Sequence, residues 1–171
     1  MLNKGFGNWI HRRRVKSAQQ VAVIHAGVSL SYAQLAERID RLSSALAAQG
    51  VVRGSRVAFL GANHAAYLET MFAATQLGAL FVPLNVRLAP RELNFALRDS
   101  GSEVLVYVEN FTAEAKAAIE GSPVNQAWEV ALIPGVDSSY ERALQAGEAT
   151  HPDLAVELED PAIILYTSGT T

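Results

Sequence analysis

The feature that most constrains the fold is a regular alternation of short apolar segments with amphipathic helical segments. The apolar segments are typical of buried strands because they are short and rich in β-branched and aromatic residues. They are residues 56–60, 79–84, 104–108 and 128–133. The helical segments between them are the right length for right-handed crossovers, which join parallel strands. We therefore predict an α/β fold, a mostly parallel sheet with helices on both faces, in which residues 57–60, 79–82 and 104–108 are neighbouring strands.

Capping and turn residues mark the ends of the predicted helices. Ser31 opens the clearest helix, with Gln34 as its capping-box partner and Gly50 just past its end. Pro90 is suited to the first position of another helix, which Ser100-Gly101 ends. Further helices are expected near the N-terminus and at residues 68–75, 112–120 and 140–146, with two short strands at 21–26 and 29–30.

Two apolar segments carry additional signals. Pro83 lies within residues 79–84, and we expect it to end the pairing of that strand because proline has no backbone N–H. Residues 162–165 read Ala-Ile-Ile-Leu and follow the Asp160-Pro161 turn, which predicts a further buried strand. That strand leads into residues 166–171, a loop with four Ser or Thr hydroxyls and one glycine.

The composition of residues 166–171 is suited to binding an anion. Hydroxyls and backbone N–H groups around a glycine form a concave donor surface for the oxygens of a polyphosphate. The loop is not a Walker loop, because it has no Gly-Lys-Ser/Thr sequence. Gly5-x-Gly7 is no dinucleotide fingerprint either, since Ile10 stands where a glycine is needed. The alternative interpretation of residues 166–171 is an ordinary turn rich in serine and threonine.

The sequence Tyr-Thr-Ser-Gly-Thr-Thr resembles the opening of the phosphate-binding motif of adenylate-forming enzymes, which include the acyl-CoA synthetases, firefly luciferase and peptide-synthetase adenylation domains. In that family the motif continues Gly-x-Pro-Lys-Gly, whereas this sequence stops at Thr171. Upstream segments are similar to the early region of fatty-acyl-CoA synthetases, and their spacing to the loop matches the family. They are residues 32–35, 54–58, 78–88, 92–93 and 99–101.

The resemblance implies the N-terminal part of an ATP-dependent acyl-CoA synthetase. Residues 1–171 would form the N-terminal portion of its large AMP-binding domain, ending within the phosphate-binding loop, with the C-terminal domain absent. The parent ligase would convert a carboxylic acid, expected to be a fatty acid, and MgATP into an acyl-adenylate and pyrophosphate. It would then transfer the acyl group to coenzyme A.

The same resemblance assigns the ATP phosphates to residues of the hydroxyl loop. These are Thr167, Ser168, Gly169, Thr170 and Thr171, of which the last two are the strongest candidates. Tyr166 is interpreted as a packed aromatic residue. No catalytic residue and no metal ligand is expected within this chain, because the family's remaining machinery would follow Thr171. The 171 residues alone are therefore expected to be inactive.

Two alternatives stay open on the sequence. The first is a non-catalytic binding or interaction module derived from this fold, and the second is a relative that adenylates aryl or amino acids. A Gly-x-Pro-Lys-Gly continuation in the gene would favour the enzyme, and a stop codon directly after Thr171 would favour the module.

Other polar residues are interpreted as structural. Asn85 and Arg87 follow a predicted strand end, where ligands often bind, but a role in stabilising the loop is favoured. The acidic residues of the connector at 147–160 are interpreted as a solvated run. None of the four histidines is assigned a role, because they show no zinc spacing and no two share a helical face; they are His11, His25, His64 and His151.

Charge and composition exclude several classes of protein. The formal net charge of -3 argues against a nucleic-acid surface, so no nucleic acid partner is expected. The absence of cysteine excludes disulfides, thiolate metal sites and a cysteine nucleophile within these residues. No apolar run has the length of a signal peptide or membrane span, so we predict a soluble, cytoplasmic protein.

Two surface features are also expected. The basic residues 11–16, beside Trp9 and Ile10, would suit a membrane surface or an acyl partner, but a solvated helix face is favoured. The apolar residues 163–165 are expected to be covered by a partner chain or poorly ordered, because the fragment lacks its downstream cover. Self-association through this apolar surface is therefore one expectation.

Overall fold

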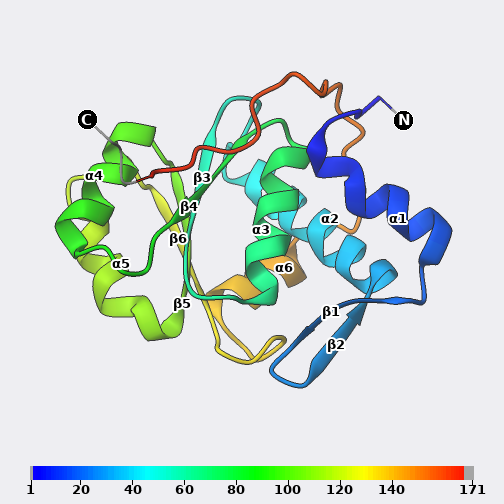
Figure 1. The fold of residues 1–171 in the computed structure, drawn as a ribbon, viewed down its shortest axis with the longest axis horizontal. Helices are drawn as coiled ribbons and strands as arrows, with labels where there is room; N and C mark the ends of the chain where they lie inside the picture. Colours follow the sequence, from blue (N-terminus) through cyan, green and yellow to red (C-terminus); the bar gives the residue numbers. More distant parts are fainter. Residues whose placement is uncertain (1, 168–171) are drawn as a thin grey trace.

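A four-stranded parallel sheet forms the centre of the molecule (Figure 1). The computed structural model describes residues 2–167. The strands lie in the order β4-β3-β5-β6, and every neighbouring pair is parallel. Their bounds are β3 Arg56–Leu60, β4 Leu80–Leu84, β5 Val104–Val108 and β6 Gln126–Val130. The predicted α/β class is confirmed, and so are the predicted parallel neighbours, with β3 lying between β4 and β5.

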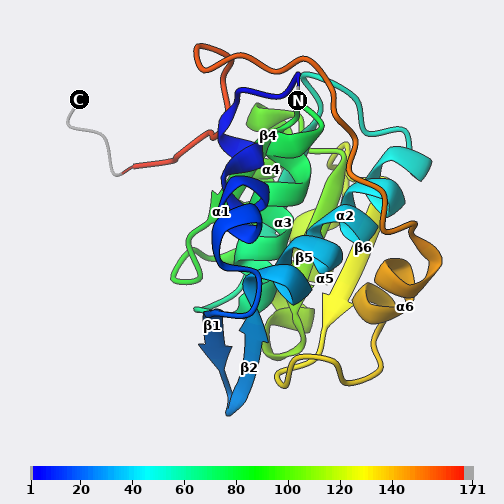
Figure 2. The same cartoon turned by 90° about the vertical axis from the view of Figure 1, so that its right-hand side faces the viewer.

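Helices cover both faces of this sheet (Figures 1 and 2). Because the crossover from β3 leads to one neighbour and the crossover from β4 returns past β3 to the other, their helices lie on opposite faces. One layer contains α1 Trp9–Ser17, α2 Tyr32–Ala48, α3 Ala65–Gln76 and α6 Ser139–Ala146. The other contains α4 Pro90–Ser100 and α5 Thr112–Ile119. Among residues 2–167, every helix is too short or too polar to cross a membrane.

The remaining elements are short. β1 Val21–His25 and β2 Val28–Ser31 form an antiparallel hairpin that projects from the end of the helical layer (Figure 2). The 3-10 helices are η1 Phe6–Asn8 and η2 Glu109–Phe111.

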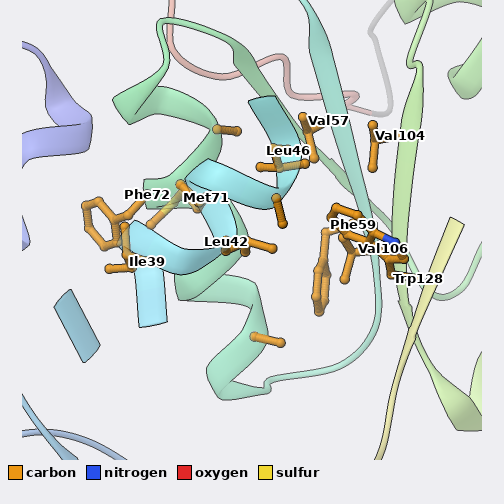
Figure 3. Close-up of a cluster of buried hydrophobic side chains, with 14 of the residues drawn as sticks. Ile39, Leu42, Leu46, Val57, Phe59, Met71, Phe72, Val104, Val106 and Trp128 are labelled. Carbon is orange, nitrogen blue, oxygen red and sulfur yellow. The ribbon is translucent and has the colours of Figure 1, made fainter. Parts of the chain in front are cut away.

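Each strand divides its side chains between two cores. In β3, Val57 and Phe59 point toward α2 and α3, whereas Ala58 and Leu60 point toward α4 and α5. Figure 3 shows the first core, in which side chains of α2 face those of β3, β5 and β6. Burial on both faces explains why β3 and β5 have continuous apolar sequences.

The helix ends follow the predicted capping residues. The Gln34 backbone N–H donates to Ser31 Oγ at 3.3 Å, and the Ser31 N–H donates to Gln34 Oε1 at 2.9 Å, which completes the capping box of α2. Pro90 is the first residue of α4, and Gly101 ends that helix in the left-handed conformation with φ 64°. These predictions are confirmed.

A buried ionic network joins α2, α3 and α6. Arg38 Nε lies 2.6 Å from Glu69 Oε1, and Arg38 Nη2 lies 2.5 Å from Glu141 Oε1. The Tyr140 hydroxyl donates to Glu69 Oε2 at 2.7 Å. Burial and the nearby Glu69 carboxylate raise the pKa of Tyr140 well above its ordinary value, so the hydroxyl stays protonated and able to donate.

The prediction that Pro83 ends strand pairing is wrong. Parallel pairing with β3 continues through Pro83 to Leu84. Phe81 directs its N–H and carbonyl away from β3, where they bond to Ala162 and Ile164. Pro83 lies two residues further along and presents its nitrogen to the same side, so the pairing with β3 needs no N–H from it.

The predicted bounds of strand β6 lie two to three residues too far along the chain. β6 is Gln126–Val130, whereas the apolar sequence suggested residues 128–133. Gln126 pairs with Val104 of β5 although it is polar. Leu132 and Ile133 are about half exposed and lie in the turn that leads to α6, so their apolar character does not report burial in the sheet.

Residues 162–165 do not form the predicted buried strand. They make one parallel bridge, between Ile163 and Phe81 of β4, with the Phe81 N–H donating to the Ala162 carbonyl at 2.8 Å. Ile164 packs on the α4 and α5 core, but Ile163 is 38% and Leu165 is 68% exposed. Within residues 2–167, β4 is the only strand beside this segment, so the apolar run forms a half-exposed sheet edge.

The connector at residues 147–160 packs along the helical layer and reaches the N-terminus (Figure 1). The Val156 carbonyl accepts backbone hydrogen bonds from Lys4 at 2.8 Å and Gly5 at 3.0 Å. Arg53 donates to the Ala155 carbonyl at 2.9 Å. These contacts hold the connector against the beginning of the chain.

Candidate functional site

The structure describes the approach to the predicted phosphate-binding loop. Thr167 is the last described residue, and its side chain is exposed. Ser168, Gly169, Thr170 and Thr171 lie outside the described residues. Their role therefore stays a prediction, and the geometry of the site is built from residues 162–167 and the elements they contact.

Tyr166 fixes the segment that leads into the loop. Its hydroxyl lies 2.8 Å from Asp99 Oδ2 and 3.2 Å from the Ala96 carbonyl, and both acceptors belong to α4. Its ring packs on the core between the sheet and the α4 and α5 layer. Burial and the hydrogen bond to Asp99 raise the pKa of Tyr166, which keeps the donor proton in place. The interpretation of Tyr166 as a packed aromatic residue is confirmed.

An open groove lies beside this anchored segment. It has a volume of about 580 Å³ and is lined by Tyr166, by α4 and by the turn before α4. Phe95 contributes to the groove an apolar side chain that is 62% exposed. The charged residues that line the groove are Arg91 and Glu92. The groove therefore combines an apolar surface with two opposite charges, next to the residues that begin the hydroxyl motif.

The turn after β4 lies at the carboxyl end of that strand, and residues 162–164 run toward the same end because they are parallel to β4. Asn85 Oδ1 accepts from the Arg87 backbone N–H at 3.0 Å, and the Asn85 carbonyl accepts from Leu88 at 3.1 Å. Asn85 therefore stabilises its turn, as predicted. The strand that ends at this turn, β4, is the one that Ile163 bridges at Phe81.

The acidic residues of the connector form surface ion pairs. Lys4 Nζ lies 3.1 Å from Glu157 Oε2, and Arg53 Nη2 lies 2.5 Å from Asp160 Oδ1. Asp160 Oδ2 also accepts from the Glu157 backbone N–H at 2.8 Å. These carboxylates neutralise neighbouring cations and fix a turn, and they are not paired with each other for acid–base chemistry.

Sequence reasoning missed the grouping of the histidines. His11 and His151 stack with their ring centroids 4.0 Å apart, and both approach the carboxylate of Asp40. His25 and His64 form a second pair with centroids 4.3 Å apart. No spacing rule finds these pairs, because each joins residues from distant segments. The sequence gives no signal for Asp40 either, because it lies among the charged residues Glu37, Arg38 and Arg41 of α2 and its burial is seen only in the structure.

The comparisons with known proteins identify the family. The sequence matches the family described as AMP-binding enzyme over residues 10–171. The chain belongs to the AMP-binding enzyme family. The predicted resemblance to adenylate-forming enzymes is thereby confirmed, including the stretch that carries the hydroxyl motif.

Several curated relatives of this family member are acid–CoA ligases. A feruloyl-CoA synthase from Amycolatopsis sp is 44% identical over 171 residues, which is all of this chain and 32% of the relative. The long-chain-fatty-acid–CoA ligase FadD13 of Mycobacterium tuberculosis is 33% identical and covers 98% of this chain and 33% of the relative. The chain thus spans about a third of the length of the curated relatives it matches.

Solved structures share the fold. The inhibitor-bound N-terminal domain of FACL13 from Mycobacterium tuberculosis superposes with a TM-score of 0.87 at 30% identity, covering 98% of this chain and 42% of that one. The anthranilate CoA ligase AuaEII, in complex with anthranoyl-AMP, gives a TM-score of 0.90 at 22% identity over 100% of this chain and 33% of that one. The α/β architecture is therefore that of the N-terminal domain of acyl-CoA synthetases.

Proposed function

We propose that the protein containing this chain is an ATP-dependent acid–CoA ligase, and that residues 1–171 form the N-terminal portion of its large domain. The ligase activates a carboxylic acid as an acyl-adenylate, releases pyrophosphate and transfers the acyl group to coenzyme A. The observation that carries the proposal is the family match, which runs through the hydroxyl motif to Thr171.

The proposed role of this chain is to bind the ATP phosphates. Thr167 directly follows the anchored Tyr166 and is exposed, which suits a group that must reach a ligand. The donors Thr167, Ser168, Gly169, Thr170 and Thr171 would contact the β- and γ-phosphates. Pyrophosphate gains charge as it leaves the α-phosphorus, so fixed donors and Mg²⁺ would stabilise the transition state more than bound ATP.

Two classes of acid are candidate substrates. The sequence motifs favour a fatty acid, which the similarity to FadD13 supports. The higher identity to feruloyl-CoA synthase, 44% against 33%, favours an aromatic acid as the second candidate. The pocket that selects the acid is expected beyond Thr171, and a cytoplasmic location stays a prediction from the sequence.

The test is acid-dependent exchange of labelled pyrophosphate into ATP by the full-length protein. A panel of ferulic, cinnamic and indoleacetic acids and of medium- and long-chain fatty acids separates the two substrate classes. We expect exchange with one class, with thioester formation when coenzyme A is added. Absence of exchange with every acid and with amino acids, in a protein that is folded, would instead favour the non-catalytic module.

A further inference from the structure

Three ligating side chains meet at a buried point on the face of the helical layer away from the sheet. His11 comes from α1, Asp40 from α2 and His151 from the connector. His11 Nε2 lies 3.1 Å and His151 Nδ1 lies 3.4 Å from Asp40 Oδ1. Within residues 2–167, one ligand atom from each of the three lies within 4.8 Å of the other two. The side chains of His11 and Asp40 are each 2% exposed.

The short distances between these atoms are in the range of ion pairs, but they lack the alignment of hydrogen bonds. Neither ring nitrogen of His11 and neither ring nitrogen of His151 has a hydrogen-bond partner, although all four are buried. His11 Nε2 and Asp40 Oδ1 are therefore close together without the alignment that a shared proton requires. Buried nitrogens of this kind are costly unless another group satisfies them.

A metal ion accounts for both the distances and the missing alignment. Two ligands of one ion point at the ion, and not at each other. Tetrahedral ligands about 2.0 Å from Zn²⁺ are separated by about 3.3 Å, which is close to the two separations measured here. Two imidazole nitrogens and one carboxylate oxygen are a donor set that Zn²⁺ and related divalent transition metals accept.

We propose that His11, Asp40 and His151 bind a divalent transition-metal ion, with Zn²⁺ as the best fit. Three protein ligands leave a fourth position for water. His151 is the ligand nearest to solvent, with 17% of its side chain exposed, so an ion reaches the site from the connector side. The bound ion fastens α1 and the connector to α2.

The residues around the site support this assignment. Gln76 Nε2 donates to Asp40 Oδ1 at 3.0 Å and so orients the carboxylate, as outer-shell groups do at metal sites. Gln76 Oε1 is buried without a hydrogen-bond partner and is available to a metal-bound water. Arg14 Nη1 lies 3.9 Å from Asp40 Oδ2, but its side chain is 42% exposed and has room to turn toward solvent.

The second histidine pair provides a matched control. His25 and His64 also stack, but they belong to no three-residue group of ligating side chains among residues 2–167. His64 Nδ1 already accepts the Ala66 backbone N–H at 3.0 Å as the cap of α3. His25 is therefore the substitution that removes a stacked histidine without removing a proposed ligand.

The experiment titrates the full-length protein, stripped of metal and free of nucleotide, with Co²⁺ followed by its visible absorption, and then with Zn²⁺ in competition. We expect one Co²⁺ per chain, displaced by Zn²⁺. Loss of an outer-shell partner costs about 10- to 100-fold in affinity, so loss of a direct ligand in His151→Gln should cost more than about 100-fold. His25→Gln should bind as the wild type does.

Two results would overturn the proposal. One is a wild-type protein that binds neither ion, which would make the three residues an ordinary buried ion pair. The other is unchanged binding by His151→Gln. Asp40 is buried, so the Asp40→Asn variant can fail to fold. Its fold is therefore checked by circular dichroism before the titration. His151→Gln lies on the connector, so the proposal can be tested with this variant alone.

Discussion

Strand β5 and residues 162–165 have similar apolar sequences but different environments. Every residue of β5 is buried, with a parallel strand on each side and a helical layer on each face. Residues 162–165 have one strand neighbour, and their exposure alternates along the segment. A short run of β-branched residues and leucines therefore predicts an extended backbone in both places, but burial depends on neighbours that only one of them has.

The largest expected effect is a difference in unfolding free energy between two leucine-to-alanine variants of the 171-residue chain, one in β5 and one in residues 162–165. Leu105 of β5 is 0% exposed, so Leu105→Ala should lower the free energy of unfolding by about 2–5 kcal/mol. Leu165 is 68% exposed, so Leu165→Ala should change it by less than about 0.5 kcal/mol. Urea unfolding of both variants measures the difference. Similar losses in both would show that the two regions are equally packed.

The second prediction concerns the cost of Leu165→Ala to the free energy of unfolding of the full-length protein. If the chain after Thr171 covers the sheet edge, Leu165→Ala should now cost about 2 kcal/mol or more, since it leaves a cavity. Urea unfolding of the full-length variant gives the value, with Leu105→Ala as the internal standard. A cost still below about 0.5 kcal/mol would mean that the edge stays open. Sedimentation of the 171-residue chain shows whether a second copy covers it there.

The third prediction concerns the anchor of the half-exposed segment. Tyr166→Phe removes the hydroxyl that lies 2.8 Å from Asp99 and keeps the packed ring. Because the acceptor is exposed, the free energy of unfolding should fall by about 1 kcal/mol or less. Amide hydrogen exchange should accelerate at residues 163–166 and stay unchanged in β5. Equal acceleration in both regions would mean that the segment is part of the same cooperative unit as the sheet.

The smallest expected effect is a pH dependence of the free energy of unfolding, caused by the buried His64. Burial and the nearby His25 lower the pKa of His64. Below about pH 6.5 the unfolded chain takes up a proton that the folded chain resists, so stability should fall as the pH falls. His64→Asn retains a side-chain oxygen to cap α3 and removes the titration. Urea midpoints between pH 5 and 7.5 should therefore vary less in this variant, and an unchanged pH dependence would exclude His64 as a cause.

Local sequence rules predicted most of the fold. β3 and β5 have the predicted bounds, and Ser31 and Gly101 mark helix ends as expected. These features depend on backbone hydrogen bonds and on burial within a few residues, which the sequence reports directly. Local rules predicted a buried strand at residues 162–165, and only the separate expectation of an uncovered apolar surface pointed to their exposure, because burial there depends on which segments lie beside β4.

The candidate site was predicted in part. The hydroxyl motif was recognisable because its residues are contiguous, and Tyr166 was correctly interpreted as a packed residue. The grouping of His11, Asp40 and His151 could not be predicted, because the three belong to distant segments that are brought together by the packing of α1 and the connector on α2. Spacing rules for metal ligands apply to neighbours in sequence, and these ligands are neighbours only in space.

The proposed role of this chain is to bind the phosphates of ATP, and Thr171→Val tests that role most directly. The substitution keeps the shape of the side chain and removes its hydroxyl. Single-turnover rates are measured for both half-reactions of the full-length protein, acyl-adenylate formation and thioester formation from pre-formed acyl-adenylate. Adenylate formation should slow by about 10²-fold, with an upper range near 10³-fold, as for the loss of one oxyanion-hole donor.

Thioester formation should be nearly unchanged in the same variant, because no pyrophosphate leaves in that step. Equal slowing of both half-reactions, or no slowing of adenylate formation, would contradict the phosphate role of Thr171.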